Sequence, residues 1–138
     1  MVNVKDIDTE APEDGDWLQN IFNRQFQLEE KYHDIEEGNG FIHPPSVGEL
    51  DDAKTQWFLK DAAYRVVEEL SEATNCFKNK PWKQTQVLTD KEHYFEEVAD
   101  AFHFFVRFCI YSGLNAEALY KMYFKKSEVN LFRQESKY

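Results

Sequence analysis

Cysteine is scarce in this 138-residue chain, since Cys76 and Cys109 are its only thiols. It has no CxxC motif and no Cys/His cluster, which argues against a structural zinc site. Both cysteines lie in segments with the apolar pattern of helices, so we expect two buried free thiols rather than a disulfide. Free thiols are typical of a reducing compartment, and we therefore expect a cytoplasmic protein.

Long apolar runs are also missing. The N-terminal residues 1–16 are acidic and contain no apolar signal core, so secretion is not expected. The most apolar run, residues 98–111, is interrupted by Asp100, His103 and Arg107 and is short for a membrane span. The sequence therefore predicts a soluble protein that has no membrane partner.

Basic residues are too few to balance the acidic ones. The chain has 16 Lys and Arg against 26 Asp and Glu, a net charge of -10. General binding to a nucleic-acid backbone needs Lys and Arg surfaces, so no nucleic-acid partner is expected. A nucleotide substrate remains compatible with this charge, because metal ions bridge acidic side chains to phosphate.

No strand pattern, internal repeat or low-complexity tract occurs, and helical spacing dominates. We expect a loose acidic leader over residues 1–15 and a single all-α domain over residues 16–138. Four helices are predicted, from Trp17 to about Glu36, from Glu49 or Asp51 to about Lys78, from Asp90 to Ser112 and from Ala116 to about Gln134. They predict a four-to-five-helix bundle.

The expected ends of these helices carry suitable capping residues. Asp16 and Asn115 suit N-cap positions, and Gly113 suits the position after a helix C-terminus. The composition, 42% hydrophobic with twelve Phe and seven Tyr, predicts an aromatic core. In a bundle of this size, some of those aromatic side chains are expected at a subunit interface.

Two short acidic motifs lie inside the second and third predicted helices. Glu69 and Glu72 form an ExxE motif, and Glu97 and Asp100 form an ExxD motif. Residues three apart on a helix point within about 60° of each other, so each motif presents two carboxylates on one face. Both motifs flank apolar stripes, and that of the second helix consists of Leu59, Ala63, Val66, Leu70 and Ala73.

The connection between the motifs is long enough for the two helices to lie antiparallel, so that four carboxylates converge. Such a concentration of negative charge needs compensation. Mg²⁺, with Mn²⁺ as an alternative, is the natural cation for oxygen ligands. The alternative is that both motifs are ordinary solvated helix faces, because Glu and Asp are common there.

Further short segments accompany the acidic motifs in a fixed order. They are Trp82-Lys83, His103-Phe104 and the set Lys126, Asn130, Arg133 and Gln134. Together with ExxE and ExxD, this order resembles the signature of the all-α nucleoside triphosphate pyrophosphohydrolases. That superfamily includes MazG-like enzymes, the dimeric all-α dUTPases and phage dCTPase-dUTPases, and the similarity is greatest to the dUTPase branch. It covers roughly residues 60–138.

The resemblance implies a MazG-like or all-α dUTPase architecture and a metal-dependent reaction. Glu69, Glu72, Glu97 and Asp100 would hold two or more Mg²⁺ ions, and Glu69 would act as the catalytic general base. The bond between the α- and β-phosphates would break, which gives a nucleoside monophosphate and pyrophosphate.

The resemblance also implies substrate-binding residues outside the acidic motifs. They are Gln25, Trp82, Lys83, His103, Phe104, Lys126, Asn130 and Arg133. His103 and Phe104 would line the base pocket, although His103 also fits an ordinary core or surface histidine. An amide of the first helix would read a pyrimidine edge, and of Asn23, Gln25 and Gln27 we favour Gln25. Lys126 and Arg133 would contact phosphate, although by position alone they fit a solvated cationic end of the last helix.

Trp82 and Lys83 follow the first motif in the polar connection between the second and third helices. Trp82 would cover the base and Lys83 would reach a phosphate. The alternative for Trp82 is an aromatic side chain that anchors a loop after Pro81.

Three functions are compatible with these features. The first is Mg²⁺-dependent hydrolysis of dUTP, or of dUTP and dCTP, by a homodimer or homotetramer. The second is a broader MazG-like pyrophosphohydrolase that acts on purine or modified nucleotides. The third is a helical binding protein without catalysis.

Overall fold

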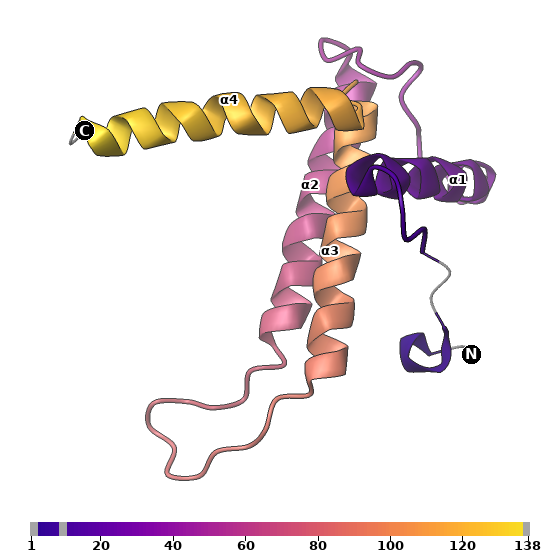
Figure 1. Ribbon diagram of the computed structural model, residues 1–138. Coiled ribbons are helices and arrows are strands. Elements are labelled where there is room, and N and C mark those ends of the chain that lie inside the picture. Colours follow the sequence, from indigo (N-terminus) through magenta and orange to yellow (C-terminus); the bar gives the residue numbers. More distant parts are fainter. Residues whose placement is uncertain (1–2, 9–10, 137–138) are drawn as a thin grey trace.

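The structure is a computed structural model and describes residues 3–8 and 11–136 (Figure 1). This part of the chain is all-α and has no strand. Its elements are the short 3-10 helix η1 (Val4–Asp6) and the helices α1 (Trp17–Gly38), α2 (Ala53–Thr74), α3 (Lys91–Tyr111) and α4 (Ala116–Glu135). The predicted all-α class and the four helices are confirmed. Of the predicted leader, residues 1–2 and 9–10 lie outside the described residues.

Each of the four α-helices begins at a capping side chain, which explains where it starts. Asp16, Asp52, Asp90 and Asn115 each accept a hydrogen bond from the backbone N–H three residues later. These bonds satisfy donors that the first helical turn leaves without a partner. The predicted caps Asp16 and Asn115 are therefore confirmed.

Gly113 ends α3 as predicted, and it also allows a close approach of two loops. Its φ is +87°, which favours glycine, and a Cβ atom there would lie 3.1 Å from the Cα of Gly48. The Gly48 backbone N–H donates to the Tyr111 carbonyl at 3.1 Å. This contact attaches the α1–α2 connection to the C-terminal end of α3.

Helix α2 ends at Thr74, earlier than the predicted Lys78. After it, the Asn79 side chain donates to the Val87 carbonyl at 2.9 Å and accepts from the Val87 N–H at 2.8 Å. Asn79 thereby joins the two ends of the α2–α3 connection. The helix itself ends where the backbone bonds tighten, since the Cys76 N–H donates to the Ala73 carbonyl and the Phe77 N–H to the Thr74 carbonyl, each at 3.0 Å.

Contact between the helices is concentrated in one pair, α2 and α3, unlike in the predicted four-to-five-helix bundle. Helices α2 and α3 form an antiparallel hairpin, whereas α1 and α4 lie across it near the C-terminal end of α3, and α4 projects outward (Figure 1). A small apolar core joins α1, α3 and α4 there, and it consists of Phe22, Val106, Cys109, Ile110 and Ala116. Ala116 is the buried residue of α4 among those described.

The hairpin is held by buried apolar residues that include several alanines. They are Phe58, Leu59, Ala62 and Ala73 of α2 and Ala101 of α3. Small side chains let the two backbones approach closely. In the predicted stripe of α2, Leu59 and Ala73 are buried, but Ala63 and Leu70 are exposed.

The prediction of an aromatic core is wrong for the single chain. Among the described residues, Phe22 and Phe58 are the fully buried phenylalanines. The two cysteines are free as predicted, but only Cys109 is buried and Cys76 is half-buried. Among the helices that the structure describes, none is both long and apolar enough to cross a membrane.

Candidate metal centre

Three of the four predicted metal ligands form one cluster between α2 and α3. Glu69, Glu97 and Asp100 each offer a carboxylate oxygen, and these atoms all lie within 4.8 Å of one another. Glu97 is 8% exposed, and Glu69 and Asp100 are half-buried. Glu72 is exposed and borders the cluster, where its charge acts on both Glu69 and Glu97. The antiparallel hairpin therefore brings the ExxE and ExxD motifs together as predicted.

The pKa values of the cluster reflect burial of like charges. Burial, a hydrogen bond with Glu97 and the charges of Glu72 and Asp100 raise the pKa of Glu69 to about 7. Burial also raises the pKa of Glu97, and Glu72 adds to this shift. Burial also raises the pKa of Asp100, and the charge of His103 acts in the opposite direction. Each carboxylate thus favours a proton or another compensating cation.

Two carboxylate oxygens in the cluster have no hydrogen-bond partner. They are Oε2 of Glu69 and Oε2 of Glu97, and both are buried. A buried oxygen without a partner costs free energy, which a cation at that position would recover. The nearest basic group among the described pairs is His93, whose Nε2 lies 3.6 Å from Oε1 of Glu97. Buried carboxylate oxygens without partners are the donor set that Mg²⁺ and Mn²⁺ prefer, so the residues fit these ions.

A cavity of about 430 Å³ adjoins the carboxylates and extends between α1 and α3. Its lining consists of Gln25, Glu29, Tyr32, Glu36, Glu69, Asp100, His103, Phe104 and Arg107. Three residues predicted for substrate binding, Gln25, His103 and Phe104, therefore lie in the same cavity as two predicted metal ligands. Gln25, on an N-terminal helix far away in the sequence, reaches this cavity because α1 crosses the hairpin (Figure 1).

A hydrogen-bond network lines one side of the cavity. His103 Nδ1 lies 2.9 Å from Gln25 Oε1, and Gln25 Nε2 donates to Glu29 at 2.9 Å. Arg107 Nε donates to both oxygens of Glu29 at 3.0 Å, and the same guanidinium donates to Glu36. Gln25, Glu29 and Arg107 are buried. The network thus connects α1 to α3 through a buried ion pair between Arg107 and Glu29.

Burial alone would lower the pKa of Arg107. The hydrogen bonds and charges of Glu36 and Glu29 outweigh this effect, and the pKa of the guanidinium rises as a result. Arg107 is therefore a permanent positive charge beside the cavity.

Sequence reasoning missed part of this cavity. Tyr32, Glu29, Glu36 and Arg107 were given no functional role, although they line it. Helical spacing was the available signal, because Glu29 follows Gln25 by four positions and Arg107 follows His103 by four. Spacing within one helix does not show which other helix faces it.

Other predicted substrate-binding residues do not line the cavity within one chain. Trp82 and Lys83 lie in the exposed α2–α3 connection, and Trp82 is 77% exposed. Lys126, Asn130 and Arg133 lie on the part of α4 that projects away from the hairpin (Figure 1). Their roles in substrate binding stay predictions.

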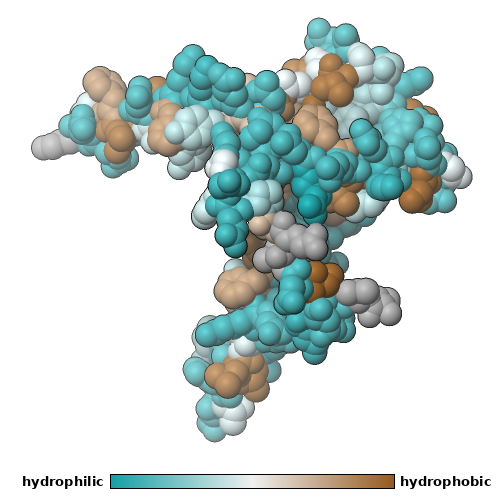
Figure 2. All heavy atoms as spheres, turned by 45° about the vertical axis from the view of Figure 1, so that its right-hand side comes forward, coloured by the Kyte–Doolittle hydropathy of each residue, from teal (hydrophilic) through white to brown (hydrophobic). Residues whose placement is uncertain are grey.

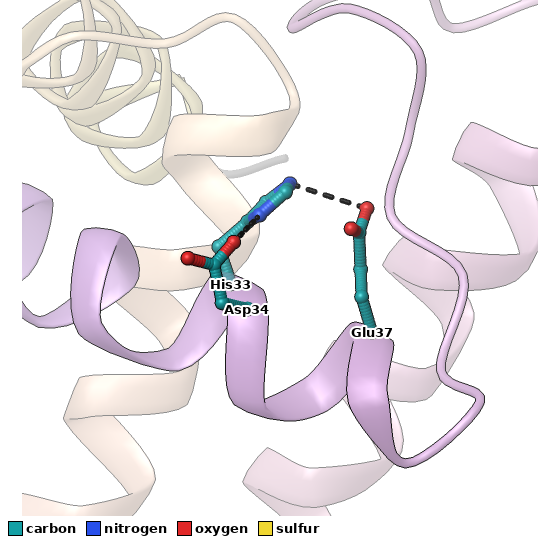
Figure 3. Close-up of side chains that lie close together, drawn as sticks. All are labelled: His33, Asp34 and Glu37. Atoms are coloured by element: carbon teal, nitrogen blue, oxygen red, sulfur yellow. Dashed lines mark hydrogen bonds and ion pairs between the residues drawn. The ribbon is translucent and has the colours of Figure 1, made fainter.

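A second group of possible metal ligands lies on α1 and is exposed. Figure 3 shows His33 between two carboxylates, with Nδ1 at 3.2 Å from Asp34 and Nε2 at 3.3 Å from Glu37. The Asp34 side chain is 96% exposed, so water solvates this group well. Exposed ion pairs of this kind contribute little free energy, and the group fits an ordinary helix surface better than a metal centre.

No family model, no curated protein and no solved structure matches this chain.

Proposed function

We propose that this protein is a Mg²⁺-dependent nucleoside triphosphate pyrophosphohydrolase. Its substrate would be dUTP, or dUTP and dCTP, and its products the monophosphate and pyrophosphate. The observation that carries this proposal is a trio of clustered carboxylates with two buried oxygens lacking partners, beside a cavity with amide, imidazole and aromatic side chains. The order of short motifs in the sequence supports the same reaction.

The carboxylates would have two roles, metal binding and proton transfer. Glu69, Glu97 and Asp100, with Glu72 at their edge, would hold Mg²⁺. Bound Mg²⁺ supplies charge neutralisation at the triphosphate and lowers the pKa of an attacking water. Glu69 would accept the proton from that water, as the resemblance of the ExxE motif implies.

The rest of the cavity would hold the nucleoside. Its volume of about 430 Å³ lies within the usual range for small-molecule sites. Phe104 offers an aromatic ring to a base, and Gln25 and His103 offer polar atoms that can pair with the base edge. This arrangement supports a nucleotide substrate over a phosphate compound without a base.

The active form would be a homodimer or homotetramer. Apolar side chains are exposed along the arm that α4 forms (Figure 2). They include Met122, Phe124, Val129, Leu131 and Phe132. Exposed apolar patches of this kind are typical of interfaces, and closed symmetric dimers are the commonest oligomers. In such an assembly, Lys126, Asn130 and Arg133 from a second copy would supply phosphate contacts that one chain lacks.

Two free thiols support a reducing location for this enzyme. We place it in the cytoplasm, where nucleoside triphosphates occur and disulfides are rare. A nucleic-acid partner is not part of the proposal, because the net charge of -10 disfavours it.

Pyrophosphate release from a panel of dNTPs and NTPs, with Mg²⁺ and with EDTA, tests this function. We expect metal-dependent release that is confined to dUTP, or to dUTP and dCTP. Glu69→Gln should lower the rate by about 10²–10⁴-fold, because it removes the proposed general base. Glu68→Gln is the matched control, since the neighbouring Glu68 carboxylate pairs with Arg65 at 2.9 Å instead of joining the cluster.

Other results of the panel would select another function. Equal release from purines and pyrimidines would move the protein to the broader MazG-like activity on purine or modified nucleotides. No release from any nucleotide would contradict hydrolysis and favour a binding protein.

A further inference from the structure

Besides carboxylates of the cluster, the cavity lining contains an ion pair that the proposed reaction does not use. Arg107 is 7% exposed and Glu29 is 6% exposed. The Nε–H group of the guanidinium donates to both oxygens of Glu29 at 3.0 Å, which holds this carboxylate beside Arg107. Glu36, which also accepts from Arg107, prevents the guanidinium from turning away.

This ion pair determines which way the Gln25 amide points. An ionised carboxylate accepts hydrogen bonds and donates none, so Glu29 must face the NH₂ group of Gln25. The other amide atom, Oε1, therefore faces His103 Nδ1 at 2.9 Å. Because Oε1 is an acceptor, His103 must carry its proton on Nδ1, and in the neutral ring Nε2 is then an acceptor.

We propose that Glu29 and Arg107 are positioning residues that hold Gln25 and His103 in one hydrogen-bonding polarity, so that the cavity distinguishes uracil from cytosine. This inference rests on the proposed function and names its substrate more narrowly. The wall presents one remaining amide N–H of Gln25 and one acceptor on His103. Neither residue reverses its polarity while Glu29 stays ionised and paired.

Uracil and cytosine differ in the order of hydrogen-bond donors and acceptors that they would present to Gln25 and His103. Uracil has an acceptor at O4 beside a donor at N3, whereas cytosine has a donor at N4 beside an acceptor at N3. A glutamine that rotates freely serves both bases by exchanging its NH₂ and oxygen. A glutamine held by Glu29 can pair with only one order of donor and acceptor on the base edge. A base with the opposite order would leave buried polar groups without hydrogen bonds, which costs free energy.

The simpler alternative is that Arg107 and Glu29 only stabilise the packing of α1 on α3. That alternative predicts a loss of stability on substitution without any change in base preference. It also makes no prediction about the imidazole tautomer. Measurements of the His103 tautomer and of the preference between uracil and cytosine therefore distinguish a positioning role from a purely structural one.

The first experiment measures the His103 tautomer in the metal-free protein by long-range ¹H–¹⁵N NMR at about pH 8, where imidazole side chains are ordinarily neutral. We expect the Nδ1–H tautomer. Gln25→Leu removes the acceptor and should shift His103 towards Nε2–H, whereas Glu30→Gln, an exposed neighbour on α1, should not. The Nε2–H tautomer in the wild-type protein would overturn the proposal.

The second experiment measures Kd for the non-hydrolysable α,β-imido analogues of dUTP and dCTP with Mg²⁺. We expect the wild-type protein to prefer one base by at least about 100-fold, because unmatched polar groups discriminate strongly. Glu29→Gln should reduce this ratio to within about 10-fold, and Glu30→Gln should preserve it. Equal affinities in the wild-type protein, an unchanged ratio in Glu29→Gln, or binding of neither analogue would overturn the proposal.

These readouts do not depend on turnover. If both analogues bind with the expected preference and no nucleotide is hydrolysed, the proposed reaction fails and the positioning role stands. If hydrolysis occurs and both bases are processed equally, the reaction stands and the positioning role fails.

Discussion

At the scale of single residues, the acidic cluster and the buried ion pair differ in how their negative charge is compensated. Glu29 is buried beside Arg107, and its negative charge is compensated within the chain. Glu97 is buried and Glu69 is half-buried beside other carboxylates, and their compensation must come from protons or cations. The two groups should therefore respond differently to pH, metal and substitution.

The acidic cluster should make the metal-free protein less stable as the pH rises. The pKa of Glu69 is about 7 in the folded protein against 4.5 ordinarily, so the folded state binds more protons between these values. The free energy of unfolding should therefore fall from about pH 5 to about pH 8. Urea denaturation in EDTA measures this fall, and Mg²⁺ should reduce it by replacing the proton.

Glu69→Gln is the control for this dependence. The variant lacks the titrating carboxylate, so its free energy of unfolding should fall less steeply over the same range. A wild-type protein that becomes more stable as the pH rises through this window would contradict the prediction.

The ion pair should be costly to break from one side. Arg107→Met leaves Glu29 buried and Glu36 half-buried without their cation, and we expect a loss of about 3–5 kcal/mol in the free energy of unfolding. Arg65→Met is the matched control, because Arg65 pairs with Glu68 on the exposed side of α2. Its loss should be at most about 1 kcal/mol. Equal losses in the free energy of unfolding for Arg107→Met and Arg65→Met, measured by denaturant unfolding, would contradict this prediction.

At the scale of elements, α4 is the helix with the least support. It has 20 residues, yet Ala116 is its buried residue among those described. Most helices in proteins are stabilised by packing of an apolar face, so α4 depends strongly on its N-terminal attachment. The cap at Asn115, which accepts from the Ala118 N–H at 2.8 Å, is part of that attachment.

Removal of this cap should therefore be measurable. Asn115→Ala should lower the free energy of unfolding by about 1 kcal/mol, because it leaves helical donors without partners. Asn130→Ala provides the comparison, since Asn130 lies exposed within α4 and substitution there should change stability by less than about 0.5 kcal/mol. A cap substitution without effect would contradict this contribution of Asn115 and leave the packing of Ala116 in the apolar core as the attachment of α4.

At the scale of the whole molecule, one chain leaves much apolar surface uncovered. The arm formed by α4 exposes Phe124 and Leu131 together with other apolar residues (Figure 2). Burial of apolar surface stabilises by about 25 cal/mol per Å², so a second copy that covers this arm would gain substantially. In the proposed assembly, a second copy would cover this surface.

Sedimentation at micromolar concentration should therefore show a dimer or tetramer. The double substitution Phe124→Ser and Leu131→Ser should shift the protein towards monomer, because it removes apolar area from the arm. Lys125→Ser, which changes a neighbouring polar residue, should leave the assembly intact. A wild-type monomer at this concentration would contradict the assembly.

Much of the fold and half of the candidate site followed from local pattern. The helix starts at Asp16 and Asn115 and the end at Gly113 were predicted because capping depends on a few adjacent residues. The convergence of Glu69 with Glu97 was predicted because an antiparallel hairpin leaves few alternatives for two acidic faces. The same reasoning failed for the pair Glu29 and Arg107, because these two residues lie 78 positions apart in the chain.

The sequence by itself determined the all-α class, the helix boundaries within a few residues and the acidic faces, because these depend on periodicity and capping within one helix. Only the tertiary structure decided that α1 and α4 cross the hairpin, that Gln25 and His103 share a cavity with Glu69, and that Arg107 lines it as well. Such relations depend on which helix faces which, and that is set by packing between distant segments, where many arrangements satisfy the same periodicity.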